Sequence, residues 1–196
     1  MKLLKILPIL LALMIIPCQS FAEMPEITAG QTYFDVFKGH YVLKDNVRVV
    51  MNNHGLTATI TANEARVNVV QQKCWALGNV NFLHVDYELK CDNAYLQWQT
   101  KTAELVGGID FKGKKSVAVT SEKATFNWEN KVADFYGEVK VTAEKDLQFE
   151  EGLTLEDGVI YEHVRYNVTE NKILQLDKTF DIPKIEIPDP DGDSGK

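Results

Sequence analysis

Residues that could support chemistry are scattered along this chain. The sequence contains no glycine-rich phosphate loop and no G-x-S-x-G nucleophile turn. The four histidines, His40, His54, His84 and His163, do not have the spacing of metal ligands, so we expect them at the surface. The carboxylates are dispersed too, as is typical of solvated faces. The sequence therefore favours a function without catalysis, metal or cofactor.

The C-terminal residues 181–196 are rich in proline and acid. Asp189, Asp191 and Asp193 in DPDGDSG faintly resemble a calcium loop. The glycine is misplaced for an EF-hand, and the sequence ends before a closing glutamate. We therefore predict an acidic, disordered tail rather than a cation site.

The first 22 residues have the composition of a secretory signal peptide. Two lysines precede an apolar run over residues 6–16, and small residues lead up to Ala22. The run is too short for a membrane-spanning helix, which needs about 20 apolar residues. Cys18 raises the alternative of a lipoprotein, but the proline directly before it fits a lipidation site poorly. We predict cleavage after Ala22 and export.

The charge of the remaining chain is strongly negative. Removal of Lys2 and Lys5 leaves 19 basic against 28 acidic residues, a net charge of −9. An acidic surface repels nucleic acid, so we discount that class of partner. The same charge disfavours a closed phosphate pocket.

After the N-terminal segment, a pattern recurs with a period of about 30 residues, which lies within the range of known repeat architectures. Ala65, Ala94 and Ala124 occupy equivalent places in NEARVNV, DNAYLQW and EKATFNW. Val164 in EHVRYNV is a weaker copy at a longer interval, which implies an insertion. Apolar and polar residues alternate within each copy, which predicts strands with one apolar and one wet wall. The wet wall repeats an amide at one position: Asn68, Gln97, Asn127 and Asn167.

Each copy also predicts a corner. Polar pairs at 63–64, 92–93 and 122–123 separate inward positions by an odd number of residues, so the strand must bulge or bend there. Glycines permit a bend or a close backbone approach at the start of the next strand. These glycines are Gly78, Gly107 and Gly137.

The repeat therefore predicts an all-β domain over residues 23–180, in which stacked copies share one apolar interior. The inward aromatic residues can be plain core or can line a groove, and the residues alone leave both readings open. The residues predicted to line the interior are Val67, Val69, Val80, Phe82, Leu89, Leu96, Trp98, Ile109, Phe111, Val119, Phe126, Trp128, Val139 and Val141.

Cys74 and Cys91 fall at small inward positions of this repeat, where other copies carry alanine or serine. One alternative is a pair of buried thiols that act as small apolar groups. The other is a disulfide, which an oxidising compartment permits and which needs Cα atoms within about 7 Å. The sequence does not separate the two.

The G-N-V strand start, followed about halfway through the copy by a polar pair and Ala-aromatic, resembles the OstA-like family of periplasmic lipopolysaccharide-transport bridge proteins. The stretch ITAGQTYFDVFKGHYVLKDNVRV from Ile27 is similar to the opening repeat of that family. The resemblance covers roughly residues 26–145, and 164–176 fit a further copy.

This resemblance implies a folded-over antiparallel β jelly roll, shaped like a taco shell and built from stacked repeats. It implies a periplasmic protein whose groove holds the acyl chains of lipopolysaccharide or a related envelope glycolipid. Such proteins pass lipid from inner to outer membrane, and join partners of the transport machinery and copies of themselves end to end by edge-strand pairing.

Two rival functions follow from the same repeat. A β-solenoid or envelope assembly scaffold would use the apolar interior only as a core. An enzyme acting on envelope polysaccharide would carry clustered acids at equivalent outward positions, where this sequence carries Asn and Gln.

Overall fold

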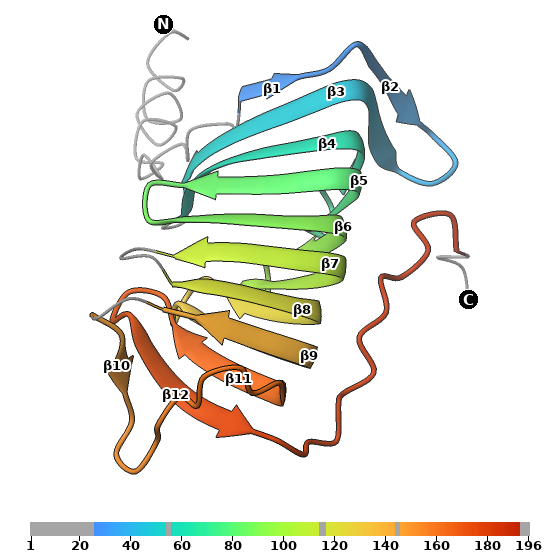
Figure 1. Ribbon diagram of the computed structural model, residues 1–196. Helices are drawn as coiled ribbons and strands as arrows, with labels where there is room; N and C mark the ends of the chain where they lie inside the picture. The colour runs from blue at the N-terminus through green and yellow to red at the C-terminus, as the bar shows by residue number, and fades with distance from the viewer. Residues whose placement is uncertain (1–25, 54–55, 114–116, 144–145, 193–196) are drawn as a thin grey trace, which may run out of the picture.

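The computed structural model describes residues 26–53, 56–113, 117–143 and 146–192, so the predicted signal peptide lies outside the described residues. This part of the chain is all-β, and its strands form one sheet in the order β1-β3-β4-β5-β6-β7-β8-β9-β11-β12-β10, with β2 also paired to β3 (Figure 1). Pairing is antiparallel throughout except between β10 and β12. The strands are β1 (Glu26–Thr28), β2 (Gln31–Asp35), β3 (His40–Asn53), β4 (Leu56–Asn68), β5 (Lys73–His84), β6 (Tyr87–Gln97), β7 (Thr102–Gly113), β8 (Ala118–Asn127), β9 (Val132–Thr142), β10 (Gln148–Phe149), β11 (Tyr161–Asn167) and β12 (Lys172–Asp177).

The long strands bend at the predicted corner. The ladder shifts register between Thr61 and Glu64, and again at 90–93 and 120–123, where the polar pairs lie. A register shift of this kind is a β-bulge, which bends and twists a strand. The prediction of an all-β sheet folded over on itself is confirmed.

The corner glycines are required by both backbone conformation and contact. Gly78, Gly107 and Gly137 have φ values of 74°, 83° and 73°, a region that disfavours side chains. A Cβ on Gly78 would also lie 2.6 Å from the amide nitrogen of Asn63, and one on Gly107 would clash with Asp92. At each corner, therefore, a polar side chain of one strand lies directly against the glycine of the following strand.

The bend divides the sheet into two arms that face each other. The first arm runs from the corner to the turns at 69–72, 98–101, 128–131 and 168–171, and the second arm runs from the corner in the opposite direction. Phe111 of the second arm packs against Phe135 of the first, with ring centroids 5.4 Å apart. Apolar side chains of both arms thus share one interior.

The repeated amides have a local role that the sequence did not reveal. Asn127 accepts backbone hydrogen bonds from Glu129 and Asn130 at 2.9 and 3.2 Å. Asn68 and Asn167 accept equivalent bonds in their own turns. These three asparagines therefore fix their turns at the end of the first arm rather than form a simple wet wall.

Candidate functional site

The interior between the arms contains most of the predicted inward residues. Val67, Trp98 and Val141 are half-buried and pack against the same cluster as the rest. Val69 does not face the interior, because the chain has left β4 for the following turn, and its side chain is 63% exposed. The predicted residues that are buried are Val80, Phe82, Leu89, Leu96, Ile109, Phe111, Val119, Phe126, Trp128 and Val139.

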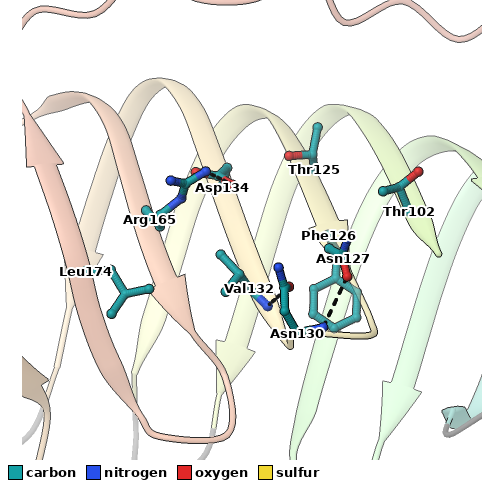
Figure 2. A pocket seen from close by; sticks show the side chains of 9 residues that line it. All are labelled: Thr102, Thr125, Phe126, Asn127, Asn130, Val132, Asp134, Arg165 and Leu174. Atoms are coloured by element: carbon teal, nitrogen blue, oxygen red, sulfur yellow. Dashed lines mark hydrogen bonds and ion pairs between the residues drawn. The ribbon is translucent and has the colours of Figure 1, made fainter. Parts of the chain in front are cut away.

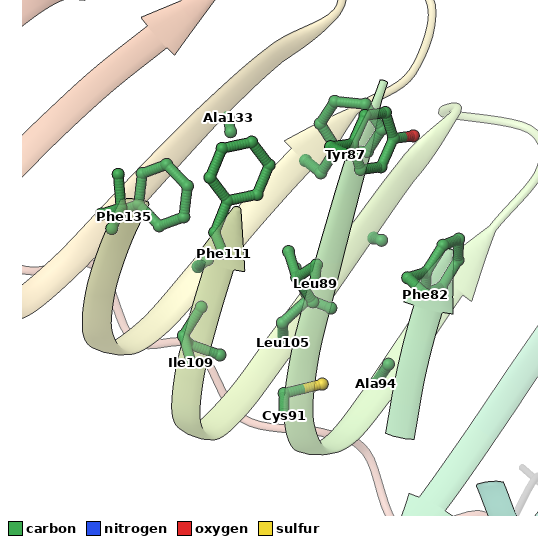
Figure 3. Close-up of a cluster of buried hydrophobic side chains, with 14 of the residues drawn as sticks. Phe82, Tyr87, Leu89, Cys91, Ala94, Leu105, Ile109, Phe111, Ala133 and Phe135 are labelled. Atoms are coloured by element: carbon green, nitrogen blue, oxygen red, sulfur yellow. The ribbon is translucent and has the colours of Figure 1, made fainter. Parts of the chain in front are cut away.

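Large rings fill the C-terminal half of this interior. Phe111 contacts both Phe135 and Tyr166, with centroids 5.4 and 5.7 Å apart, and Tyr87 lies 5.6 Å from Phe126. Figure 3 shows the Phe111 and Phe135 rings side by side, with Leu105 and Ile109 nearby. The cavity left beside these rings is about 20 Å³, room for about one water molecule. This half is a close-packed core.

The N-terminal half holds smaller side chains and more space. Val49, Ala62, Ala65 and other small residues leave a cavity of about 100 Å³, bounded by Trp98. An apolar cavity of about 150 Å³ can hold a benzene molecule, so this one suits a few methylene groups. Ile27 of β1 lines it and is 43% exposed, so the cavity lies at the edge of the sheet. The full lining is Ile27, Val47, Val49, Ile60, Ala62, Ala65, Val67, Cys74, Ala76 and Trp98.

The two cysteines are free, so the disulfide alternative is wrong. Cys74 lies opposite Leu96 in the first arm, whereas Cys91 lies opposite Val80 in the second arm, beyond the corner. Burial raises the pKa of each thiol to about 12. Both therefore stay protonated at neutral pH and act as small apolar groups.

Residues 146–160, here called the closing segment, cross the C-terminal end of the stack (Figure 1). The segment begins beside the first arm, where Gln148 of β10 pairs with Lys172. It ends beside the second arm, where Tyr161 pairs with Val139. The insertion inferred from the longer interval before Val164 therefore lies across one end of the interior. Its apolar side chains that pack against the core are Leu147, Phe149, Leu153, Leu155 and Val159.

Exposed apolar side chains gather at the opposite end. Phe37 and Val70, at two successive turns of the first arm, are 101% and 91% exposed. Among the exposed large apolar residues of the described chain, all but Ile160 precede residue 86. They are Ile27, Tyr33, Phe34, Val36, Phe37, Tyr41, Val69, Val70, Leu83, Val85 and Ile160.

A buried polar cluster on the outer face corrects the expectation of surface histidines. His163 is 2% exposed, and its Nε2 and Nδ1 lie 2.8 Å from Asp134 and 2.7 Å from Asp177. Burial lowers the pKa of His163, but the bonds to both carboxylates outweigh it and raise the pKa overall. His40 is buried as well, against Trp75.

A hollow of about 390 Å³, lined by polar and apolar residues, lies beside this cluster on the outer face of the first arm (Figure 2). Arg165 lines it, but its Nε and Nη2 donate to Asp134 at 2.8 and 3.2 Å. Thr102, Thr125 and Asn130 supply further polar atoms. Because the guanidinium is matched by Asp134, the hollow presents no uncompensated positive charge for a phosphate.

The C-terminal residues follow a defined path instead of the predicted disorder. Residues 178–191, here called the strap, run along the outside of the corner (Figure 1). Phe180 stacks on His163 at 4.2 Å, and Ile185 is buried. Further along, Trp75 Nε1 donates to the carbonyl of Pro188 at 2.8 Å, and Asp191 pairs with Lys38 and Arg66. Residues 193–196 lie outside the described residues.

The interior between the arms is lined mainly by apolar side chains. Within the described ranges no three His, Cys, Asp or Glu side chains gather as metal ligands. None of the described residues forms a helix long and apolar enough to cross a membrane.

Comparison with known proteins adds the fold and no more. No family model and no curated protein matches the sequence. The structure is similar to LptH from Pseudomonas aeruginosa, the LptA-homologous periplasmic component of a lipopolysaccharide transport device, with a TM-score of 0.53. The match covers 62% of this chain and 96% of LptH at 9% sequence identity. It supports the folded-over β jelly roll that the sequence predicted.

Proposed function

We propose that this protein binds acyl chains of lipopolysaccharide or a related envelope glycolipid in its apolar groove and passes them along a protein bridge, without catalysing a reaction. The observation that carries the proposal is the apolar interior that widens into a cavity of about 100 Å³ at the N-terminal end. The fold shared with LptH, a component of a lipopolysaccharide transport device, supports it.

The energetics of such a groove follow from its lining. Each methylene group exposed to water costs roughly 0.8 kcal/mol, and burial among Val49, Ile60 and Val67 would offset that cost. The full chain carries a net charge of −7, so sugars and phosphates are expected to stay in solvent, outside the groove.

The proposal includes location and partners. The N-terminal segment would direct export to the periplasm and be removed after Ala22, so the exported chain would begin at Glu23. N-terminal sequencing of the exported protein tests this. Exposed strands β1 and β2 would accept a strand of a transport component at the membranes, or of a second copy, by β-augmentation.

Lipid analysis of the natively purified protein tests the proposal directly. We expect mass spectrometry to find an acylated glycolipid with the wild-type chain. Trp98→Glu places a charge at the half-buried wall of the cavity and should abolish copurification. Gln99→Glu adds the same charge at the next residue, which is exposed, so it is the matched control and should retain the lipid.

The dense C-terminal half favours one alternative, a scaffold that uses its interior only as a core. A scaffold would emerge without lipid from mild purification, and an acyl probe would not bind to it. Empty wild-type protein together with absent probe binding would therefore replace the transport proposal by the scaffold.

A further inference from the structure

We infer that the groove is blind: an acyl chain enters and leaves only through the N-terminal end, beside β1, while the closing segment seals the other end. This inference rests on the proposed function and specifies the route that the lipid takes. It follows from the two ends of the stack, which differ in packing, in covering and in exposed apolar surface.

The closing segment is fixed to both arms of the sheet. At the first arm, Asn171 Nδ2 donates to the carbonyl of Asp146 at 2.9 Å, and Tyr166 donates to Asn171 at 2.8 Å. Near the second arm, the backbone N–H of Glu156 donates to the Tyr161 hydroxyl at 3.1 Å. Phe149 and Leu155 lie between these attachments and pack against the core. The closing segment is therefore held at both of its ends and covers the end of the interior.

Large buried rings fill the interior behind the closing segment. Phe111, Phe135 and Tyr166 are fully buried, and the space beside Phe111 is about 20 Å³. An acyl chain could pass only by displacing these rings, and close-packed interiors resist such insertion. The block is thus several residues deep.

The N-terminal end has the opposite properties. Its cavity of about 100 Å³ is lined by small apolar side chains and reaches Ile27 on the edge strand. The side chains of β1 are all exposed, and the exposed apolar residues of the molecule concentrate at the same end. Exposed apolar surface marks interaction sites, and here Ile27 is exposed and also lines the cavity.

A blind groove restricts the place of this chain in a bridge. A middle member must receive lipid at one end and release it at the other, which requires an open path between them. This chain would receive and release lipid at one end, as a terminal acceptor or donor does. Its partner would dock at β1 and β2 and not at β12.

Site-specific photocrosslinking tests the route. Val49 and Val141 occupy the same position in the first and fourth copies of the repeat, and both are half-buried. A photoreactive phenylalanine analogue at either position is challenged with fluorescently labelled lipid A. We expect strong labelling at position 49 and labelling weaker by on the order of tenfold at position 141.

A variant with an opened closing segment provides the second part of the test. Phe149→Ser/Leu155→Ser should bring labelling at position 141 close to that at position 49. Equal labelling of both positions in the wild-type background overturns the inference while leaving lipid binding intact. An opened variant that binds lipid A but stays unlabelled at position 141 also overturns it. Loss of all lipid A binding in the wild type would instead refute the proposed function, and the route with it.

Discussion

Val49 and Phe111 face the interior from the same position of the repeat, yet they leave different amounts of space. Around Val49 the cavity measures about 100 Å³, and beside Phe111 it measures about 20 Å³. The backbone of the two regions is the same bent ladder, with a bulge at each corner. Because both regions share this backbone, the difference in space follows from the volumes of the side chains that line each region.

The largest expected effect on stability comes from removing a buried ring in the C-terminal half. Phe135→Ala should lower the free energy of unfolding by about 4 kcal/mol, because Phe135 is fully buried against Phe111. Val49→Ala, beside existing space, should cost about 1 kcal/mol. Urea denaturation measures both. Similar losses at the two sites would mean that the halves are packed alike.

The repeat explains how much of this fold the sequence could predict. The phase of Ala65, Ala94 and Ala124 predicted the strands, and the polar pairs and glycines predicted the corner, because both depend on residues within one copy. The failure at Val69 is also local, since the Asn68 side chain starts a turn one residue earlier than the alternation suggests.

The outer face could not be predicted in the same way. His163 is buried by Asp134, Asp177 and Phe180, which come from two other strands and the strap, so no local pattern marks the cluster. One signal was present: Trp75 falls on the wall expected to be wet. A large apolar residue there predicts that something covers it, and the strap does.

The second expected effect is a pH dependence confined to the closed half. Because the pKa of His163 is raised above its ordinary 6.5, its charged contacts contribute fully below about pH 6.5. They weaken as pH rises through the raised value. His163→Asn should therefore cost about 3 kcal/mol at pH 6 and less at pH 9. Urea denaturation at both values measures the difference.

Two other titratable groups, Asp134 and Tyr136, contact His163 and could contribute to the pH dependence. The pKa of Asp134 is lowered, because the bonds from His163 and Arg165 outweigh burial, so its contribution is lost only in acid, below its ordinary range. Tyr136 stacks on the imidazole without donating to it. A pH profile that is unchanged in His163→Asn would show that the imidazolium is not the titrating group.

A third comparison uses two buried alanines, Ala65 at the open cavity and Ala133 in the dense half. Ala65→Val fills existing space, so it should be neutral or stabilise by about 0.5 kcal/mol, and it should weaken binding of an acyl probe. Ala133→Val overpacks and should cost about 1–3 kcal/mol. Thermal denaturation measures the change in stability of each variant, and titration with the acyl probe measures binding. A loss of stability of similar size at both sites would contradict the packing difference.

The smallest expected effect concerns the strap, which joins the two halves along the outer face. Trp75→Phe keeps an aromatic ring, smaller than the indole, and removes the Nε1–H that donates to the Pro188 carbonyl. We expect a loss of about 1 kcal/mol in the free energy of unfolding. Hydrogen exchange should show the change in β3 to β5, where the strap ends, rather than in β9 to β12.

A double-mutant cycle isolates that contact from the rest of the indole. Truncation after residue 187 removes Pro188 together with the Asp191 pairs to Lys38 and Arg66. If the carbonyl of Pro188 is the partner that matters, Trp75→Phe should cost little more in the truncated chain than truncation alone. An undiminished cost there would assign the effect to packing against His40 and Tyr95, whose rings lie 5.2 and 5.1 Å from Trp75. The N-terminal half would then be stabilised by its own outer aromatic residues, without help from the strap.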